Sequence, residues 1–461
     1  MREQLSMIGN KRTQVKSEDL WDVIAEKELP LTSKIHLPDS LLEPEFVLQD
    51  EIKQVCSQPT NTSIPLTYKA PAIFSFFAGV GFLDLGFESR GFKIAHVNEY
   101  YSSFLEAYRY TRNYLKIPQP EYSYYQGSAT DFIEGKKRNQ LTDIIKDARK
   151  TSDIIGFIGG PPCPDFSIGG KNRGREGDNG KLSATYIEII CQQKPDFYLF
   201  ENVKGLWKTA RHREFYEELK KRTQEDYVTV ECLVNSIEYG VPQDRDRIIL
   251  LGFKRSLFAS GSYQFDKKIV FPWRKYASYS SEKIFNSLWP VTNPFEEDSS
   301  IPCPESSIQE LTVEHWFRRN DVLNHPNAFQ YFKPRAGLPR FASVPEGDDS
   351  KKSFKRLHRW RYSPTACYGN NEVHLHPYKV RRISVAEALA IQSLPKNFTL
   401  PESMTLTDAF KATGNGVPYL MSASLAQTIL DFLGELNDKA YSSRHSSSNN
   451  SLAEKSGIPL R

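Results

Sequence analysis

Residues 159–170, GGPPCPDFSIGG, hold a single cysteine among three prolines. The prolines fix φ and restrict the loop, and a nucleophile benefits because fixed positioning lowers the activation barrier. As a thiolate, Cys163 would be a strong nucleophile. The apolar run IIGFIGG before the loop predicts a buried strand, which would deliver Cys163 to the carboxyl edge of a parallel sheet, where open α/β folds bind ligands.

A second apolar run, DFYLF, leads into Glu201, Asn202 and Val203 and would deliver a carboxylate to the same edge. Partial burial favours the protonated form of a carboxyl group, so Glu201 could donate a proton. A purely structural ion pair with a nearby arginine is the alternative, and the sequence leaves both open.

Residues 243–247, QDRDR, begin a further predicted strand. Alternation places Gln243, Arg245 and Arg247 on one face of this strand and the two aspartates on the other. The two guanidinium groups could bind a carbonyl oxygen, a phosphate or Glu201. A structural charge ladder is the alternative.

Gly79 and Gly81 lie between a predicted strand and a predicted helix, where glycine lets a ligand approach the backbone closely. Glu99 ends the next predicted strand and could accept hydrogen bonds from ribose hydroxyls, so the pattern favours a nucleoside-containing cofactor. The dinucleotide fingerprint would need a third glycine at Asp84, which disfavours a nicotinamide-dependent oxidoreductase. S-adenosylmethionine, which has an adenosine and no phosphate, remains, and a plain tight turn is the structural alternative.

The elements that must position these residues follow from the pattern of apolar runs. Short apolar runs that alternate with helical patterns after residue 72 predict βαβ units and a parallel sheet, so the fold class is α/β, a doubly wound Rossmann-like domain. Residues 229–253 predict two antiparallel strands around a Gly-Val-Pro turn at the sheet edge. Residues 383–395 predict an amphipathic helix, and residues 414–433 predict a turn that leads into a long apolar helix.

Residues 254–355 break the alternation and are rich in proline, serine, aromatic and basic residues. Basic side chains alternate with aromatic ones in residues 331–341 and 351–362, and such a mixture can bind nucleic acid through phosphate contacts and stacking. A solvated irregular surface is the alternative. The expected organisation is an arm of unassigned role (1–70), a catalytic and cofactor-binding domain (71–253), a smaller irregular domain (254–355), a return to the catalytic domain (356–437) and a disordered tail (438–461).

The chain has 461 residues, is 39% hydrophobic and carries a formal net charge of +4, so a nucleic-acid partner must meet a local surface. It has no apolar run of about 18 residues and no segment typical of a signal peptide, which predicts neither a membrane span nor secretion. The six cysteines form no CxxC pair, and His374 and His376 have no third ligand nearby, so we expect free thiols in a reducing cytoplasm, polar loop histidines and no metal site.

The motifs FAGVGF, GGPPCPDFS, ENV, QDRDR, RISVAEALAIQSLP and GNGVP occur in this order. Together they resemble the C5-cytosine DNA methyltransferases, especially the bacterial enzymes of type II restriction–modification systems, over residues 72–254 and 356–433. The resemblance implies that Cys163 attacks C6 of a cytosine flipped out of the duplex and that Glu201 contacts N3. It also implies that Arg245 holds the base at O2, with Arg247 beside it. C5 then takes the methyl group of S-adenosylmethionine, and loss of the C5 proton with elimination of Cys163 releases 5-methylcytosine.

The resemblance also implies a cofactor site. The family usually has an aspartate directly after the glycine of a GDI-like segment, where it meets the adenine amino group. Here Ser128 stands at that position and Asp131 follows three residues later, so either could serve. The other matching positions are Phe77, Gly79, Gly81, Glu99, Tyr100, Pro162, Asn415 and Val417.

Residues 167–181 resemble the mobile loop that closes over the flipped base in this family. Within and near this loop, the residues expected to contact DNA are Ser167, Lys171, Arg173, Arg175 and Gln243. Residues 254–355 stand where the family carries its target-recognition domain, which reads bases in the major groove.

The expected protein is thus a cytoplasmic monomer that acts on double-stranded DNA and is paired functionally with a restriction endonuclease. It is also similar to the group that recognises GGWCC or GGNCC. A tRNA cytosine-5 methyltransferase of the same family is one alternative, although that branch has a shorter recognition region. A catalytically silent DNA-binding module is another, against which the intact Cys163 and Glu201 argue.

Overall fold

The computed structural model describes residues 69–162, 178–258, 269–334, 338–368 and 372–436, which all belong to one of the two compact units of the chain. The predicted arm, apart from Lys69 and Ala70, and the predicted tail lie outside these residues, as does the segment from Cys163 to residue 177. No helix in the described ranges is long and apolar enough to cross a bilayer.

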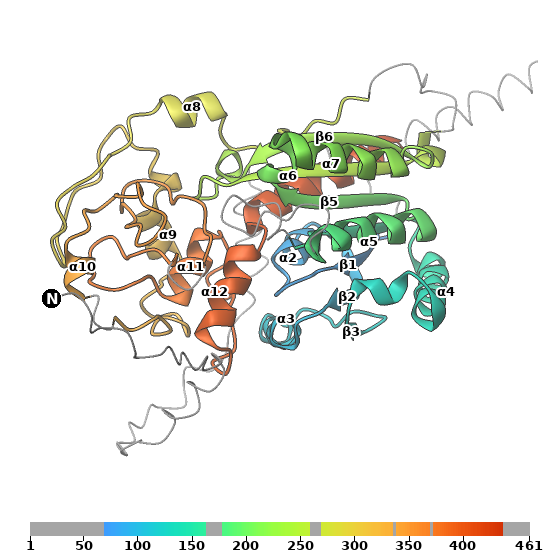
Figure 1. Ribbon diagram of the computed structural model, residues 1–461, viewed down its shortest axis with the longest axis horizontal. Helices are drawn as coiled ribbons and strands as arrows, with labels where there is room; N and C mark the ends of the chain where they lie inside the picture. The colour runs from blue at the N-terminus through green and yellow to red at the C-terminus, as the bar shows by residue number, and fades with distance from the viewer. Residues whose placement is uncertain (1–68, 163–177, 259–268, 335–337, 369–371, 437–461) are drawn as a thin grey trace, which may run out of the picture. The chain divides into compact units, whose positions relative to one another are not determined.

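A seven-stranded sheet forms the centre of the fold, with the strand order β3-β2-β1-β4-β5-β7-β6 (Figure 1). The first five strands pair in parallel, and β7 runs antiparallel to both of its neighbours. The strands are β1 (Ala72–Phe76), β2 (Lys93–Glu99), β3 (Tyr124–Gln126), β4 (Ile155–Gly159), β5 (Phe197–Val203), β6 (Tyr227–Asn235) and β7 (Asp246–Lys254). The order of the strands reverses between β1 and β4, and such a switch point is where open α/β sheets bind their ligands.

Helices pack on both faces of the sheet. Ile73 of β1 packs in one apolar cluster with residues of α2 (Phe82–Glu88), α3 (Ser102–Tyr114) and the helical residues 419–436. Its neighbour Phe74 packs in a second cluster, with residues of α4 (Gly135–Thr151), α5 (Asp178–Gln193) and α7 (Ala210–Thr223). Successive side chains of a strand point to opposite faces, so these two clusters confirm the predicted doubly wound α/β fold.

The antiparallel edge of the sheet is also as predicted. After β6, Asn235 caps the short helical turn η3 (Ser236–Tyr239), and Gly240 takes a left-handed conformation with φ of 85°. The chain then returns through Val241 and Pro242 into β7. Since β7 begins at Asp246, Gln243 and Arg245 precede the strand instead of lying in it.

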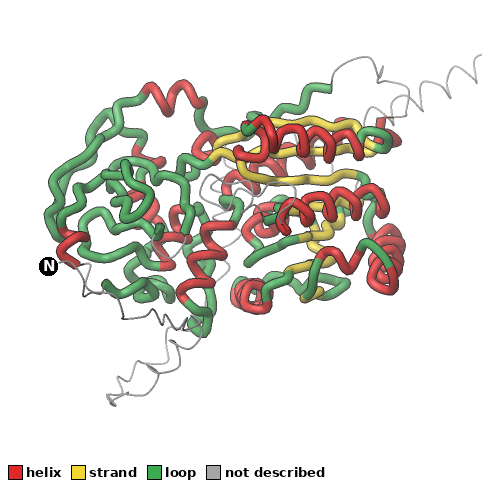
Figure 2. Tube along the Cα trace, viewed as in Figure 1, coloured by secondary structure: helices red, strands yellow, loops and turns green. Residues whose placement is uncertain are grey.

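The chain between β7 and α11 (Val385–Ile391) consists mainly of loops (Figure 2). Its helical elements are η4 (Arg255–Phe258), α8 (Ser281–Asn286), η5 (Gln309–Leu311), α9 (Val313–Arg319) and α10 (Leu338–Ala342). Two contacts join this segment to the chain after residue 356: Phe271 packs on Phe432 with ring centroids 5.3 Å apart, and the Asn327 side chain donates to the Leu400 carbonyl at 2.9 Å.

The helix α11 was expected to be amphipathic, but all seven of its residues are buried. Ser384 and Glu387 form a capping box at its start, which satisfies backbone N–H groups that would otherwise be buried without partners. The helix α12 (Leu406–Asn415) follows, and residues of both helices share one apolar cluster with Phe82 of α2 and Phe104 of α3. A helix covered on every side needs apolar residues all round.

Candidate active site

An ion pair between Glu201 and Arg247 lies at the carboxyl end of β5. Arg247 Nε is 2.8 Å from Glu201 Oε1, and each side chain is 10% exposed. The antiparallel pairing of β5 with β7 sets Arg247 opposite Val203, two residues beyond Glu201. The pair that the sequence left open is therefore present, and it lies where the fold class places ligand sites.

The backbone that leads to Cys163 runs against this ion pair. A methyl group built on Gly160 would lie 2.6 Å from Glu201 Oε2, so only glycine leaves room for the carboxylate there. The Asn202 side chain donates to the Pro161 carbonyl at 3.4 Å. Pro162 is half-buried, and Cys163, the next residue, lies beyond the described range.

Arg245 does not face this site in the way the resemblance implied. Its side chain is buried, and its guanidinium donates to the carbonyls of Ala366 (3.0 Å), Gly414 (2.8 Å) and Gly416 (3.1 Å). Burial, and then the positive charge of Arg247, lower the pKa of Arg245 to about 9. Backbone oxygens engage both terminal nitrogens of Arg245, and the arginine that pairs with Glu201 is Arg247.

Gln243 was expected to contact DNA, but its side chain is fully buried. Its Oε1 accepts from the Ala366 N–H at 3.0 Å, and its Nε2 donates to Gln392 Oε1 at 3.2 Å. Both ends of the amide are thus engaged inside the protein, and Gln243 ties the start of β7 to the chain around residues 366 and 392. The geometry does not support a DNA contact for this residue.

The predicted alternation is found for residues 243–246. The Asn235 side chain donates to both Asp244 (2.6 Å) and Asp246 (3.1 Å), so the two aspartates share a side. Arg245 donates to Gln243 Oε1 at 3.5 Å on the other side.

Glu99 is buried beside the glycine turn that follows β1. Its Oε2 accepts from the Gly79 N–H at 2.8 Å, and its Oε1 accepts from the Tyr101 N–H at 2.9 Å. Burial raises the pKa of Glu99, while these backbone donors oppose the shift. Gly79 has φ of 59°, and no described atom lies within 4 Å of a methyl group built on it, so a ligand has room there. Tyr100, which follows Glu99 in the chain, is 65% exposed.

Phe77 lies at the end of β1 and carries local backbone strain. Its φ of 55° is in the left-handed region, which a side chain other than glycine adopts at a cost of about 1–3 kcal/mol. Its ring packs edge-on against Tyr186, with centroids 5.9 Å apart. Strain of this kind concentrates at ligand sites.

The segment around Asn415 and Val417 lies beside α2. A methyl group built on Gly416 would lie 2.1 Å from the Phe82 ring, and Ser422 Oγ donates to the Leu83 carbonyl at 2.6 Å. Asn415 is exposed at the end of α12, and Val417 is buried. The fold therefore brings these two residues next to the helix that begins at the glycine turn.

Ser128 and Asp131, the alternative adenine contacts, lie just beyond β3. The Ser128 hydroxyl caps η1 (Ala129–Phe132) by accepting from the Thr130 N–H at 3.3 Å. Asp131 accepts from the Tyr125 hydroxyl at 2.7 Å. Both side chains have local hydrogen bonds, and neither is favoured over the other.

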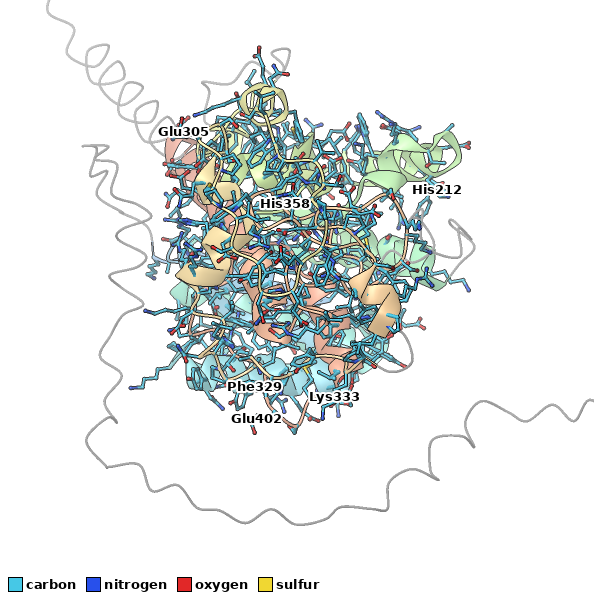
Figure 3. The ribbon with its side chains drawn as sticks, turned by 90° about the vertical axis from the view of Figure 1, so that its left-hand side faces the viewer. His212, Glu305, Phe329, Lys333, His358 and Glu402 are labelled. Carbon is cyan, nitrogen blue, oxygen red and sulfur yellow. The ribbon has the colours of Figure 1, made fainter. Side chains whose placement is uncertain are left out.

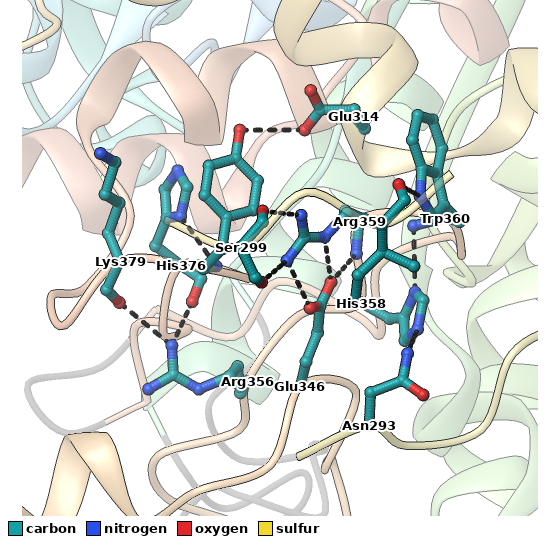
Figure 4. A network of polar contacts seen from close by, with 12 residues as sticks. Asn293, Ser299, Glu314, Glu346, Arg356, His358, Arg359, Trp360, His376 and Lys379 are labelled. Atoms are coloured by element: carbon teal, nitrogen blue, oxygen red, sulfur yellow. Dashed lines mark hydrogen bonds and ion pairs between the residues drawn. The ribbon is translucent and has the colours of Figure 1, made fainter. Parts of the chain in front are cut away.

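The basic and aromatic residues 351–362 are largely internal, which corrects the expectation of a DNA-binding surface there (Figure 4). Arg356 donates to the carbonyls of Phe341 (2.5 Å), Val344 (2.8 Å) and Lys379 (3.0 Å). Arg359 forms a two-point ion pair with Glu346 at 2.8 Å. These guanidinium groups connect loops that have almost no regular secondary structure to hold them.

His374 and His376 lie in a loop, as expected from sequence, but both side chains are buried. Burial lowers the pKa of His374 to about 3. His376 Nε2 lies 3.3 Å from Glu387 Oε1. Among the described residues, no group of three or more side chains has the arrangement of a metal site.

A cavity of about 610 Å³ lies at the start of α12, at the opposite end of that helix from Asn415. Phe329, Lys333 and Glu402 line this cavity and lie at one edge of the molecule (Figure 3). The remaining lining residues are Gln330, Tyr331, Phe332, Met404 and Leu406. None of the residues expected to act in catalysis or cofactor binding lines it.

Sequence reasoning missed Gly160 and the buried charges under the glycine turn, Asp84 and Arg112. The signal for Gly160 was the pair of consecutive glycines at the end of an apolar run. One glycine would have been enough to end the strand, so the second indicated a further requirement. The signal for Asp84 was a charge inside an otherwise apolar helical pattern, since such a charge is rarely buried without a partner. Arg112 stands among other charged residues of α3 and had no comparable signal.

Residues 72–431 match the sequence model of the C-5 cytosine-specific DNA methylases. The chain belongs to this family, and it is an S-adenosylmethionine-dependent DNA cytosine-5 methyltransferase. It is 53% identical over 375 residues to the type II methyltransferase M.NmeDI of Neisseria meningitidis serogroup C, a match that covers 81% of this chain and 86% of the relative. The type II methyltransferase M.FnuDI of Fusobacterium nucleatum is 28% identical over 367 residues, or 78% of this chain and 95% of the relative.

Solved structures share the fold. A prophage-encoded protein of E. coli, described as a DNA modification methyltransferase, superposes with a TM-score of 0.53 at 20% identity and covers 79% of this chain and 99% of its own. The S. pombe Dnmt2 methyltransferase has a TM-score of 0.50 at 10% identity, with 78% and 98% covered. At these identities the likeness concerns the fold alone. The predicted family, fold class and cofactor are confirmed.

Proposed function

We propose that this enzyme methylates one cytosine within a specific duplex site, with Cys163 as the nucleophile and with Glu201 and Arg247 as the groups that hold the base. The observation that supports these roles is the ion pair between Glu201 and Arg247, which lies directly against the backbone at Gly160. Cys163 follows Gly160 by three residues along the chain, and in this proposal its thiol adds to a ring held by the pair.

The chemistry of the three side chains is complementary. The Cys163 thiolate adds to C6, a bond from sulfur to C6 forms, and the electrons of the C5–C6 double bond move toward C5. Glu201 binds at N3 through a shared proton and Arg247 donates to O2, so both stabilise the negative charge that addition places on the ring. C5 takes the methyl group that a bound S-adenosylmethionine would supply. Loss of the C5 proton then re-forms the C5–C6 double bond, the sulfur–C6 bond breaks, and Cys163 leaves as thiolate.

The cofactor fits the space beside the glycine turn. S-adenosylmethionine supplies an electrophilic methyl group when it is bound. Glu99 would accept hydrogen bonds from its ribose hydroxyls, and Tyr100 offers an exposed ring beside the open space at Gly79. Ser128 or Asp131 would meet the adenine amino group, and the other residues proposed to line the site are Phe77, Gly81, Pro162, Asn415 and Val417.

The DNA-contacting part comprises residues 167–181 and the loop-rich segment after β7. Ser167, Lys171, Arg173 and Arg175 would contact the duplex, whereas the buried Gln243 is left out of this set. The type II names of the curated relatives support functional pairing with a restriction endonuclease, and we further propose a cytoplasmic monomer. Membership of the GGWCC- or GGNCC-recognising group is the working hypothesis for the target site.

Bisulfite sequencing of DNA from cells that express the protein tests the reaction and the target together. We expect protected cytosines at one position of one short sequence, and none in cells that express Cys163→Ser. Incubation with labelled cofactor and either duplex DNA or tRNA separates the remaining alternative, since label in tRNA alone would contradict a DNA substrate. Purified Cys163→Ser should still bind duplex DNA, because the thiol forms its bond only after the base is held.

A further inference from the structure

Asp84 occupies the position at which a dinucleotide site would have its third glycine. Its side chain is fully buried. Oδ1 accepts from Ser75 Oγ at 2.8 Å, and Oδ2 accepts from the Tyr108 hydroxyl at 2.8 Å. The carboxylate therefore links β1, α2 and α3 directly beneath the glycine turn.

Arg112 of α3 completes this buried group. It has no exposed surface, and its Nη2 donates to the Gly81 carbonyl at 3.0 Å and to Glu88 Oε2 at 2.9 Å. Its guanidinium also lies over the Tyr108 ring, 4.0 Å from the centroid. One cation thus contacts a carboxylate, an aromatic face and the backbone of the turn.

The turn itself rests on these side chains. Gly81 has φ of 85°, and a methyl group built on it would lie 2.5 Å from both Arg112 Nη1 and the Tyr108 ring. The conformation of residues 79–81 is therefore fixed from below by Arg112 and Tyr108, while the other side of Gly79 is open.

We propose that Arg112 is a positioning residue for cofactor binding, which holds the Gly81 carbonyl and thereby the shape of the turn at residues 79–81. This inference rests on the proposed function, in which that turn receives S-adenosylmethionine. Without Arg112 the Gly81 carbonyl would keep only its helical bond from the Leu85 N–H, and the turn whose Gly79 N–H meets Glu99 would be held less tightly. The effect should fall on the affinity for cofactor and not on the chemical step.

The test is a calorimetric titration of purified enzyme with S-adenosylmethionine in the absence of DNA. Arg112→Lys keeps the charge, but its side chain ends short of Nη2, the nitrogen that donates to both Gly81 and Glu88, and it lacks the planar face over the Tyr108 ring. We therefore expect Kd to rise by about tenfold. KM for S-adenosylmethionine should rise in parallel, while kcat at saturating cofactor changes less than about twofold. Arg109→Lys is the matched control, because Arg109 is an exposed arginine one turn earlier on α3 and should leave both constants unchanged.

Tyr108→Phe keeps the test decisive if Arg112→Lys folds poorly. It removes the hydroxyl bond to Asp84 and keeps the ring under the guanidinium, and we expect a smaller rise in Kd, of about threefold. If Arg112→Lys folds and its Kd for S-adenosylmethionine is unchanged, the positioning role of Arg112 is overturned. If Arg112→Lys does not fold, an unchanged Kd in Tyr108→Phe overturns it. Glu99→Gln distinguishes a failure of the proposed cofactor site from a failure of the role of Arg112. Unchanged binding of S-adenosylmethionine in Glu99→Gln argues against the cofactor site itself. Binding that is weakened in Glu99→Gln but not in the Arg112 variant refutes only the role of Arg112.

Discussion

Arg247 Nε and Glu201 Oε1 are 2.8 Å apart on two neighbouring antiparallel strands, and Gly160 backs the second oxygen of the same carboxylate. N3 and O2 of cytosine both accept hydrogen bonds, so Arg247 can donate to O2, whereas Glu201 meets N3 through a proton carried by the carboxyl group or by N3 itself. A guanidinium in such a pair also keeps the carboxylate in one rotamer.

Arg247→Ala should lower kcat for methyl transfer by about 100-fold or more, because a donor to the charge that develops on the ring is lost. Radiolabelled methyl transfer to duplex DNA measures it. Arg255→Ala, directly after the far end of β7, should retain full activity. Comparable activity of the two variants would contradict a role of Arg247 in holding the base.

Arg245→Met should lower the free energy of unfolding by about 2–4 kcal/mol, since the carbonyls of Ala366, Gly414 and Gly416 lose a buried charged donor. Urea unfolding followed by tryptophan fluorescence measures this change. If Arg245→Met is as stable as the parent but has lost turnover, the result would instead support a contact between Arg245 and the base.

Gly160→Ala should reduce turnover by about 100-fold with little effect on folding, because its methyl group would displace Glu201 from its place beside Arg247. Gly434→Ala is the control, since no described atom lies within 4 Å of a methyl group built there. Equal activities for the two alanine variants would show that the Glu201 carboxylate can shift without loss of turnover.

Glu88 should make stability depend on pH. Burial raises its pKa from an ordinary value of 4.5 to about 7, against the opposing charge of Arg112. The folded state therefore holds this proton more tightly than the unfolded state, so the contribution is fully present below pH 4.5 and is lost as pH rises through 7. We expect the free energy of unfolding of Glu88→Gln, relative to the parent, to increase by about 1–3 kcal/mol between pH 5 and pH 8. Urea unfolding at both pH values measures this difference.

The control for this comparison is Glu106→Gln, an exposed position on α3. Its unfolding free energy should follow that of the parent at both pH values. A constant difference between Glu88→Gln and the parent would mean that Glu88 is ionised in the folded protein throughout this range.

Arg359→Met should break the buried pair with Glu346, in which the side chains are 4% and 2% exposed, and cost about 3–5 kcal/mol of local stability. We expect loss of site-specific DNA binding in a gel-shift assay. Calorimetric affinity for S-adenosylmethionine should be unchanged, because Arg359 has no contact with the sheet. Adding Glu346→Leu should recover part of the loss, as it removes the unpaired buried charge. Weakened cofactor binding in Arg359→Met would show that the two regions are coupled.

Much of the fold could be predicted because the relevant signals are local. The apolar runs that became β1, β4 and β5 have the length and continuity of buried parallel strands, and the Gly-Val-Pro turn separates β6 from β7. Alternation likewise placed the two aspartates of residues 243–247 on one side.

What could not be predicted depends on partners far away in the chain. Alternation indicates that Gln243 and Arg245 share a side, but not that residues 366, 392 and 414 close over it. A basic and aromatic composition looks the same whether Arg356 and Arg359 face phosphate or backbone carbonyls. Burial of a charge is decided by long-range packing, which composition does not contain.

The contact of Gly416 with Phe82 also has a consequence for synthesis. The sheet and the glycine turn leave the ribosome more than 150 residues before the segment that lies beside α2. A nascent or truncated chain that lacks Asn415 and Val417 would have the strands in place and an incomplete cofactor pocket. Unfinished chains should therefore leave the genome unmodified, and only translation through the last part of the message yields a working enzyme.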